Sequence, residues 1–597
     1  MRCAAALIVA CATVTAAERD WHTFSNLEDT RVRHIDLDLT VSFDRKVIEG
    51  SATLLLERRR PGAPLVLDTR DLTIRGTEVS EDRVHWKRSA YALSKPDPIR
   101  GAALKIQLPA KKQAVRIRYA TGPASKALHW VNRGKRPFLF SQSWAIHARG
   151  WIPLQDTPST RITYSAVVRT PLGLLALMSA ENKSNAAATG EYRFRMPQAI
   201  PPHLMAIAVG DLEFRSLGPR TGVYAEPRMI ERAAREFAVV EKMLAAAEEI
   251  CGPYRWDRYD VLVAPGFVLG GMENARLNFL APNLVTGDGT RLSVLAHELA
   301  HSWAGNLVAN ANWRHIWISE GLTTYLENRI QEKVFGTRRA DLEAVIDRRR
   351  LDRALPHIPD EREALDCNLE GLWPDEGMDA IPYQKGALFA RALEERYGRE
   401  RFDAFLRRYF AENAFGSMTT PAFLDRVQSE LGAWPDLSVW ANQSGIPPGA
   451  PLRKSTALDE VEKWTGNWLA GSMTGPPPQA WSAQERNSIL DLLPDTLAAE
   501  KLAELDRTAF FTVSPNRDVL SRWLPLAVAN GYEPAVARLD EYLSSDEDGC
   551  PSLVYGQMMK RGELRERAQR IYARVKTNFS PACIASVDRM LEMPPPR

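Results

Sequence analysis

The stretch Leu295-Ala-His-Glu-Leu-Ala-His301 decides how the rest of this chain is interpreted. On a helix, residues four positions apart lie on one face, so His297 and His301 can direct their imidazole nitrogens at one point. Two such histidines suit a tetrahedral zinc site, which needs a third protein ligand and leaves its fourth position to water. Glu298 lies between them and can take a proton from that water. We therefore predict a catalytic metal centre on a helix within 292–308.

A third ligand is expected in the following segment, Trp317-Ile-Ser-Glu-Gly-Leu-Thr-Thr-Tyr-Leu-Glu327. Glu320 comes eighteen intervening residues after His301 and should open a second helix that packs against the first. Two histidines and one glutamate form the open ligand set of catalytic zinc sites. The alternative, two ordinary histidines in this pattern by chance, is expected about once in a hundred such sequences. We predict one Zn²⁺ ion bound by His297, His301 and Glu320.

Outward from this segment, the periodicity of the apolar residues divides the chain into three domains. The stretch from His34 to Phe43 alternates polar and apolar residues, as a half-buried strand does, and short strands recur to about residue 215. Helical spacing then begins, for example over 226–250. Ser482-Ala-Gln-Glu485 is a capping box that opens a helix near the C-terminus. The predicted ranges are an N-terminal β domain at 18–215, a catalytic domain at 216–444, a proline-rich linker at 445–455 and a C-terminal α-helical domain at 456–597.

The first residues are typical of a targeting segment. Met1-Arg2 precedes an apolar run that ends in Thr15-Ala16-Ala17, which predicts a secretory signal peptide over 1–17. We therefore expect a secreted or periplasmic protein. Ile8-Val-Ala-Cys11 also resembles a bacterial lipoprotein box, in which Cys11 would carry a lipid anchor. No other stretch approaches the length of a transmembrane span.

Composition limits the partners. The 597 residues include 77 basic and 74 acidic side chains, so the net charge of +3 predicts no nucleic-acid partner. We expect a monomer or a weakly associating protein. In an oxidising compartment Cys550 and Cys583 could form a disulfide, whereas the alternative is four buried free thiols that include Cys251 and Cys367. The sequence leaves both alternatives open.

Together these motifs resemble the aminopeptidase N family of zinc metallopeptidases, the gluzincins, and within it the leukotriene hydrolase-like branch. Gly270-Gly-Met-Glu-Asn274 is similar to the exopeptidase motif of the family, and Pro382-Tyr-Gln-Lys-Gly386 to the segment with its catalytic tyrosine. Further similarities to the β domain of the branch are in Ser141-Gln142, Ala145-Ile-His147 and Gln155-Asp-Thr-Pro158. The resemblance covers about 30 to 450 and, more weakly, the rest. It implies a multidomain α+β fold: a β-sheet saddle, a thermolysin-like, mainly α-helical catalytic domain, and a C-terminal domain of stacked helix pairs.

The resemblance also implies a zinc-dependent aminopeptidase that acts on peptides with a free N-terminus. Glu273 would bind the α-amine of the substrate, with Gln142 assisting by hydrogen bonding. Tyr383 would donate its hydroxyl to the oxyanion, Glu298 would be the general base, and Glu327 would accept a hydrogen bond from a ligand histidine. The remaining substrate-binding residues would be Gly270, Gly271, Met272 and Asn274.

Three positions depart from the pattern of the branch. Trp144 replaces a glutamine and is expected to narrow or reshape the first substrate pocket, unless it only packs in the core. Gln557 and Met559 stand where the branch has basic residues that grip a substrate carboxylate. Asp375 has the spacing of an aspartate needed for epoxide hydrolysis, but Met378 replaces a neighbouring tyrosine.

Two other functions remain as alternatives to an aminopeptidase. One is an epoxide hydrolase that acts on a lipid epoxide at the same zinc site. Asp375 supports this function, whereas Gln557 counts against it. The other is a non-catalytic, zinc-dependent peptide-binding protein on a peptidase scaffold. Such proteins usually lose the base or a ligand, whereas Glu298 and Glu320 are both present here.

Overall fold

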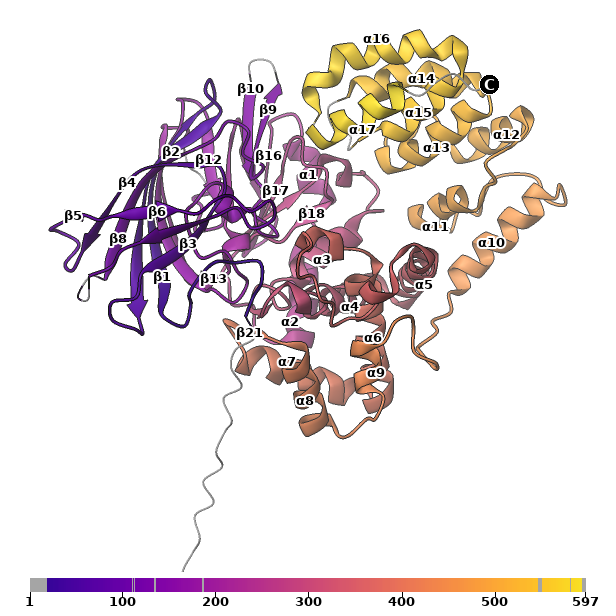
Figure 1. The fold of residues 1–597 in the computed structure, drawn as a ribbon. Helices are drawn as coiled ribbons and strands as arrows, with labels where there is room; N and C mark the ends of the chain where they lie inside the picture. Colours follow the sequence, from indigo (N-terminus) through magenta and orange to yellow (C-terminus); the bar gives the residue numbers. More distant parts are fainter. Residues whose placement is uncertain are drawn as a thin grey trace, which may run out of the picture.

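The computed structural model describes residues 19–109, 111, 113–133, 136–184, 187–545, 550–579 and 581–592. The predicted signal peptide at 1–17 and the predicted lipid anchor at Cys11 lie outside these residues. The chain forms an N-terminal β domain, a catalytic α/β domain and a C-terminal helical domain (Figure 1). The predicted three-domain fold class is thereby confirmed. No helix within the described ranges is both long and apolar enough to cross a membrane.

Amphipathic strands build the N-terminal domain. In β1, Ile35, Leu37 and Leu39 are buried on one face, while the residues between them are half-exposed or exposed, as the strict alternation predicts. The strands of this domain are β1 (Thr30–Ser42), β2 (Val47–Arg58), β3 (Leu65–Thr69), β4 (Leu72–Ser80), β5 (Lys87–Arg88), β6 (Tyr91–Leu93), β7 (Ala102–Ile106), β8 (Ala114–Thr121), β9 (Leu128–Arg133), β10 (Arg136–Ser141), β11 (Ile162–Arg169), β12 (Leu175–Met178), β13 (Glu191–Ile200) and β14 (Ile207–Gly210). Seven of them form the large sheet, in the order β13-β11-β1-β2-β8-β4-β5, and β12-β14-β10-β9 form a second sheet.

A five-stranded sheet, β15-β16-β17-β19-β18, opens the catalytic domain. Its strands are β15 (Glu213–Ser216), β16 (Thr221–Ala225), β17 (Tyr259–Val263), β18 (Gly271–Met272) and β19 (Leu277–Leu280). Strand β15 straddles the predicted boundary at 215/216. The helix expected over 226–250 is two helices, α1 (Ile230–Glu236) and α2 (Val240–Cys251), separated by a turn in which Phe237 is buried.

The helix expected over 292–308 is shorter than predicted. Helix α3 (Leu292–Ala300) ends one residue before His301, and the chain then turns into β20 (Val308–Asn310). Gly305 makes this turn possible: its φ is +102°, and a Cβ there would lie 2.4 Å from Ser319 Oγ on the next helix. The turn therefore presses directly against α4.

The remaining catalytic elements pack below and beside α3 (Figure 1). They are α4 (Trp317–Phe335), α5 (Thr337–Ala354), α6 (Gly386–Tyr397), α7 (Arg399–Glu412), β21 (Gly416–Met418), α8 (Thr420–Leu431) and α9 (Leu437–Asn442). One apolar core runs continuously through the N-terminal and catalytic domains. These two domains therefore hold each other in place.

The C-terminal helices have an apolar core of their own. They are α10 (Thr456–Leu469), α11 (Ala483–Ser488), α12 (Ala499–Ala509), α13 (Arg517–Ala529), α14 (Glu533–Ser544), α15 (Ser552–Lys560), α16 (Arg565–Val575) and α17 (Pro581–Leu591). The capping box is present, since the backbone N–H of Ser482 donates to Glu485 Oε2 and that of Glu485 donates to Ser482 Oγ. A disulfide joins Cys550 to Cys583, whereas Cys251 and Cys367 are buried free thiols.

Candidate active site

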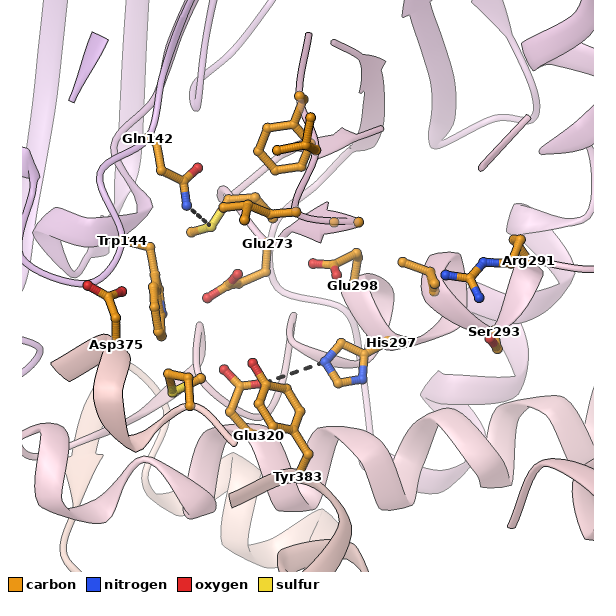
Figure 2. Close-up of a pocket in the computed structure, with 18 of the residues that line it drawn as sticks. Gln142, Trp144, Glu273, Arg291, Ser293, His297, Glu298, Glu320, Asp375 and Tyr383 are labelled. Atoms are coloured by element: carbon orange, nitrogen blue, oxygen red, sulfur yellow. Dashed lines mark hydrogen bonds and ion pairs between the residues drawn. The ribbon is translucent and has the colours of Figure 1, made fainter. Parts of the chain in front are cut away.

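Three side chains from two neighbouring helices converge in the central cavity. His297 lies on α3, His301 is the C-cap residue directly after that helix, and Glu320 lies in the first turn of α4. The two Nε2 atoms of the histidines are 3.2 Å apart. Glu320 Oε2 is 3.5 Å from His297 Nε2 and 3.3 Å from His301 Nε2 (Figure 2). The folded chain thus brings the three predicted metal ligands together into one candidate metal site.

The spacing of these atoms fits one tetrahedral metal ion. With metal–ligand distances of about 2.0–2.1 Å, neighbouring ligand atoms of a tetrahedral site are about 3.3–3.4 Å apart. The three observed separations lie close to that value. Two imidazoles and one carboxylate leave one position of the tetrahedron for a reacting group, which is the arrangement of a catalytic site rather than a structural one.

The outer nitrogen of each imidazole has its own acceptor. His297 Nδ1 is 3.0 Å from Oε2 of Glu327, which lies on the neighbouring helix α4. His301 Nδ1 is 3.0 Å from the carbonyl oxygen of Ala304 and 3.1 Å from Thr323 Oγ1. An Nδ1–H that donates to such acceptors leaves the Nε2 lone pair free for a metal and fixes the plane of the ring.

Two more carboxylates face the same point. Oxygens of Glu273 and Glu298 and a nitrogen of His301 all lie within 4.8 Å of one another. Burial raises the pKa of Glu298 to about 8, and it also raises that of Glu273. Repulsion from Glu320 acts in the same direction as burial on both pKa values. Carboxylates crowded together out of water favour cations, so the site suits a metal ion and a substrate ammonium group.

Strand β18 passes directly over Glu298. A Cβ on Gly271 would lie 2.1 Å from Glu298 Oε1, so this position requires glycine. Gly270, just before it, has a φ of +84°, which also favours glycine. Because β18 is the terminal strand of its sheet, it offers an edge to an extended peptide beside the carboxylate.

Tyr383 faces the metal site from the other side. Its ring stacks on the imidazole of His297, with centroids 6.0 Å apart, and it belongs to a π-helical turn at Ile381–Lys385. The fully buried Lys385 ammonium anchors this turn by donating to two backbone carbonyls at 2.6 and 2.8 Å. Burial raises the pKa of Tyr383 well above its usual value. Its hydroxyl therefore stays protonated and can donate a hydrogen bond.

Two glycines let this turn approach the ligand helix. A Cβ on Gly321 would lie 2.6 Å from the Cα of Gly386, so α4 and α6 cross with their backbones in contact. Gly321, which follows Glu320, and Gly386, which follows Lys385, thus both allow the two helices to cross in contact. Any side chain at the crossing would move Tyr383 away from the metal site.

The N-terminal domain supplies the opposite wall of the cavity. Gln142, which follows β10, donates from Nε2 to Met272 Sδ at 3.6 Å (Figure 2). Its buried Oε1 has no hydrogen-bond partner among the described residues, so an N–H donor from a ligand would satisfy it. Trp144 makes an edge contact with Trp313 at 5.5 Å and also lines the cavity beside Asp375. It therefore both packs in the core and shapes the pocket.

The cavity measures about 1720 Å³ and is walled by all three domains. Sequence analysis missed its far wall, which is formed by charged and polar side chains of α5 and of the C-terminal helices. Among them are Glu343, Asp347, Arg350, Asn487, Asp518 and Arg522, together with Arg291 at the start of α3. No motif marks these residues, because segments distant in sequence assemble the wall.

One residue predicted to bind substrate, Asn274, lies outside the lining of this cavity and is 1% exposed. The segment with Gln557 and Met559 does not line it either, and Met559 is buried among the C-terminal helices. Lys560 and Arg561, the basic residues that follow in this segment, are not among the residues that line the cavity.

Comparison with known proteins identifies all three domains. Residues 32–203 match the model of the peptidase M1 N-terminal domain, 235–441 match that of the peptidase family M1 domain, and 481–591 match that of the leukotriene A4 hydrolase C-terminal domain. The two M1 models therefore cover the domains that line the metal site, and the third covers the C-terminal helices.

Full-length relatives agree with this division. Leukotriene A-4 hydrolase of Xenopus laevis is 33% identical over 553 residues, which cover 87% of this chain and 90% of that protein. Leucine aminopeptidase 2 of Yarrowia lipolytica is 32% identical over 88% of this chain and 87% of that protein. The native leukotriene A4 hydrolase structure of Saccharomyces cerevisiae superposes with a TM-score of 0.88 at 28% identity, covering 97% of this chain and 98% of that one. The chain is thus a metallopeptidase of family M1 and belongs to the leukotriene A4 hydrolase-like branch of that family.

Proposed function

We propose that this protein is a zinc-dependent aminopeptidase that removes the first residue from peptides with a free N-terminus. The observation that carries the proposal is the position of Glu273, whose carboxylate lies within 4.8 Å of both His301 and Glu298. An ammonium group held there by charge-assisted hydrogen bonds brings the first peptide bond of a substrate to the metal site. The unpartnered Oε1 of Gln142 supplies a further acceptor.

The ligand set proposed for the zinc is His297, His301 and Glu320. A zinc ion held by these residues would supply Lewis-acid chemistry, by which a carbonyl group is polarised and the pKa of a bound water is lowered. Glu298 takes the proton from the attacking water and passes it to the leaving amine. The hydroxyl of Tyr383 donates to the carbonyl oxygen as negative charge develops on it.

We also propose that Trp144 sets the preference for the first residue. Its indole lines the cavity together with Met378 and Asp375, on the side of Glu273 where the first side chain of a substrate would lie (Figure 2). A Trp144→Gln variant should accept larger first residues than the wild type. An unchanged ranking of substrates would contradict this role.

The proposed activity is tested with a panel of aminoacyl-p-nitroanilides, matched N-acetylated substrates and a zinc chelator. We expect chelator-sensitive release of nitroaniline from the free-amine substrates only. Equal cleavage of the acetylated substrates would remove Glu273 from its proposed role. No hydrolysis by the zinc-loaded protein would contradict the aminopeptidase proposal itself.

A second candidate function is epoxide hydrolysis. Asp375 lines the same cavity, and burial raises its pKa. Incubation with a fatty-acid epoxide followed by product analysis tests this function. A diol that depends on both the metal and Asp375 would support it, and recovery of the intact epoxide would exclude it.

For the cellular location, we propose that the protein acts outside the cytoplasm. The Cys550–Cys583 disulfide supports this, because such bonds persist in oxidising compartments. Cell fractionation, with mass spectrometry of the mature N-terminus, tests it. A cytoplasmic protein that retains Met1 would contradict it.

A further inference from the structure

A second cavity lies at the junction of the N-terminal and catalytic domains and shares no lining residue with the metal cavity. It measures about 210 Å³, whereas one water needs only about 10–15 Å³. Three segments line it: Leu27 with Arg31–Arg33 near the start of β1, residues 159–161 before β11, and residues 415–417 at β21. Strand β21 lies beneath the N-terminal sheet in Figure 1, next to the helices of the catalytic domain.

The wall of this junction pocket carries positive charge without a carboxylate. Three of its ten lining residues are arginines, and none of the ten is acidic. Arg33 pairs with Glu57 at the rim. Arg31 donates from Nε to the carbonyl oxygen of Leu27 at 3.0 Å, and no ion pair of Arg31 is found among the described residues. Burial, with repulsion from Arg59 and Arg33, lowers the pKa of Arg31, and the nearby Glu57 and Glu28 offset this only in part.

Arg161 is the most deeply placed charge of the pocket. It donates to four backbone carbonyls, including those of Asn306 at 2.5 Å and Gly416 at 2.6 Å. These acceptors satisfy N–H groups but bring no negative charge, and burial lowers the pKa of Arg161 to about 9. Its Nε has no hydrogen-bond partner. The positive charge of Arg161 therefore lacks a counter-ion in the described part of the chain.

A hydroxyl in the same wall is also unsatisfied. Thr160 is 5% exposed, and its Oγ1 has no hydrogen-bond partner in the part of the chain that the structure describes. A buried polar group without a partner is unfavourable, so a ligand that supplies an acceptor would be stabilised there. Thr160, Arg161 and Arg31 all line a cavity that holds more than one water, and each carries a donor group that no acceptor satisfies among the described residues.

We propose that the junction pocket is a binding site for a small tetrahedral oxyanion, inorganic phosphate or sulfate, held by Arg31, Arg161 and Thr160. Arg31 would bind the anion through the N–H groups of its two terminal nitrogens, and Arg161 would bind it through its one remaining N–H, on Nε. Each of these hydrogen bonds is charge-assisted. Several acceptor oxygens allow one anion to serve two arginines and the hydroxyl at once. Chloride offers no comparable set of directional acceptors and should bind less well.

The pocket is connected to the metal cavity through one residue. Arg161 donates to the carbonyl oxygen of Asn306, and Nδ2 of Asn306 donates to the carbonyl oxygen of Glu273 at 2.8 Å. An anion that immobilises Arg161 should also steady the turn that carries Asn306. We expect slower hydrogen exchange at the backbone amides around 306–308 and 415–417 when the anion is bound.

The test measures anion binding to the full-length, zinc-loaded protein by calorimetry and thermal unfolding. Sodium phosphate and sodium sulfate should raise the melting temperature in the millimolar range, and sodium chloride of equal ionic strength should not. Arg31→Gln and Thr160→Val should each weaken phosphate binding at least fivefold. Without anion, Thr160→Val should be as stable as the wild type or more stable, because the hydroxyl that it removes has no partner.

The matched control is Arg193→Gln, which removes one positive charge from the same domain at a side chain that is 74% exposed and lies outside the pocket. It should bind phosphate like the wild type. Absence of phosphate binding, or equal binding by all three variants, would overturn the proposal. Binding that disappears after metal removal but survives both pocket variants would assign the anion to the metal site instead.

Discussion

The metal cavity and the junction pocket both bury charged side chains, but they balance the charge in different ways. In the metal cavity, imidazoles and carboxylates face each other, and Glu320 lies within 3.5 Å of both His297 and His301. In the junction pocket, Arg161 faces carbonyl oxygens, which accept its hydrogen bonds without neutralising it. Burial is unfavourable for a charge that lacks a partner. The metal cavity therefore favours a cation among its carboxylates, and the junction pocket favours an anion.

The largest effect is expected from removing a carboxylate that no imidazole neutralises directly. Glu298→Gln keeps the shape of the side chain but cannot accept a proton. We expect the hydrolysis rate to fall by about 10²–10⁴-fold, because a positioned general base contributes that much. The measurement is kcat on an aminoacyl-p-nitroanilide together with the zinc content, which should not change. A fully active variant would contradict the proposed mechanism.

Displacing the same carboxylate should have a smaller effect. In Gly271→Ala, the new Cβ would collide with Glu298 Oε1, and a shift of about 1 Å at a reacting group can lower the rate about 10²-fold. The zinc content should remain that of the wild type. Gly466→Ala is the control, because a Cβ at Gly466 meets nothing within 4 Å and should leave the rate unchanged.

Removing the hydrogen-bond acceptor of a ligand histidine tests how far zinc affinity depends on contacts between side chains of the metal site. Glu327→Ala removes the acceptor of His297 Nδ1 and should lower zinc affinity about 10–100-fold. Competition with a chromophoric chelator measures this affinity. At saturating zinc most of the activity should return, whereas an unchanged affinity would show that the hydrogen bond does not support the ligand.

The smallest effect concerns neutral histidines in the wall of the metal cavity. Burial lowers the pKa of His129 and His147 to about 4, compared with about 6.5 in an unfolded chain. Between these values the unfolded state binds more protons. The stability present above pH 6.5 is therefore lost as the pH falls towards 4.

Urea unfolding at pH 7.5 and pH 5 measures this loss. His129→Phe keeps the ring stack on Phe140, whose centroid is 4.7 Å away, but cannot be protonated. The variant should therefore lose less stability on acidification than the wild type. An equal loss would mean that His129 is not a source of the pH dependence.

Much of the metal site could be predicted because its information is local in the chain. The i, i+4 spacing of His297 and His301 places them on one helical face in any context, and Glu320 follows at the start of the next helix. Strand β1 could be predicted for a similar reason, since its period-two pattern needs no partner to be recognised. Glu273, Tyr383 and Gln142 could be assigned only through the resemblance to a family, because no spacing rule marks them.

Other features depended on contacts that the chain makes at a distance. The helix predicted over 292–308 ends early because Gly305 turns against Ser319, a contact that hydrophobic periodicity does not contain. The wall with Arg291 and Asp518 combines two domains, so neither residue stood out alone. Asn274 belongs to the stretch that resembles the binding motif, but it is buried and does not line the cavity.

By itself, therefore, the sequence determined the family, the order of the domains and the metal ligands, because each rests on short-range periodicity or on a compact motif. Only the tertiary structure decided which buried charged side chains have an oppositely charged neighbour. Arg31, Thr160 and Phe415 are far apart in the chain, and only the docking of two domains encloses them in one pocket. The free energy of a buried charge depends on what surrounds it in space, and that is not encoded in any one segment.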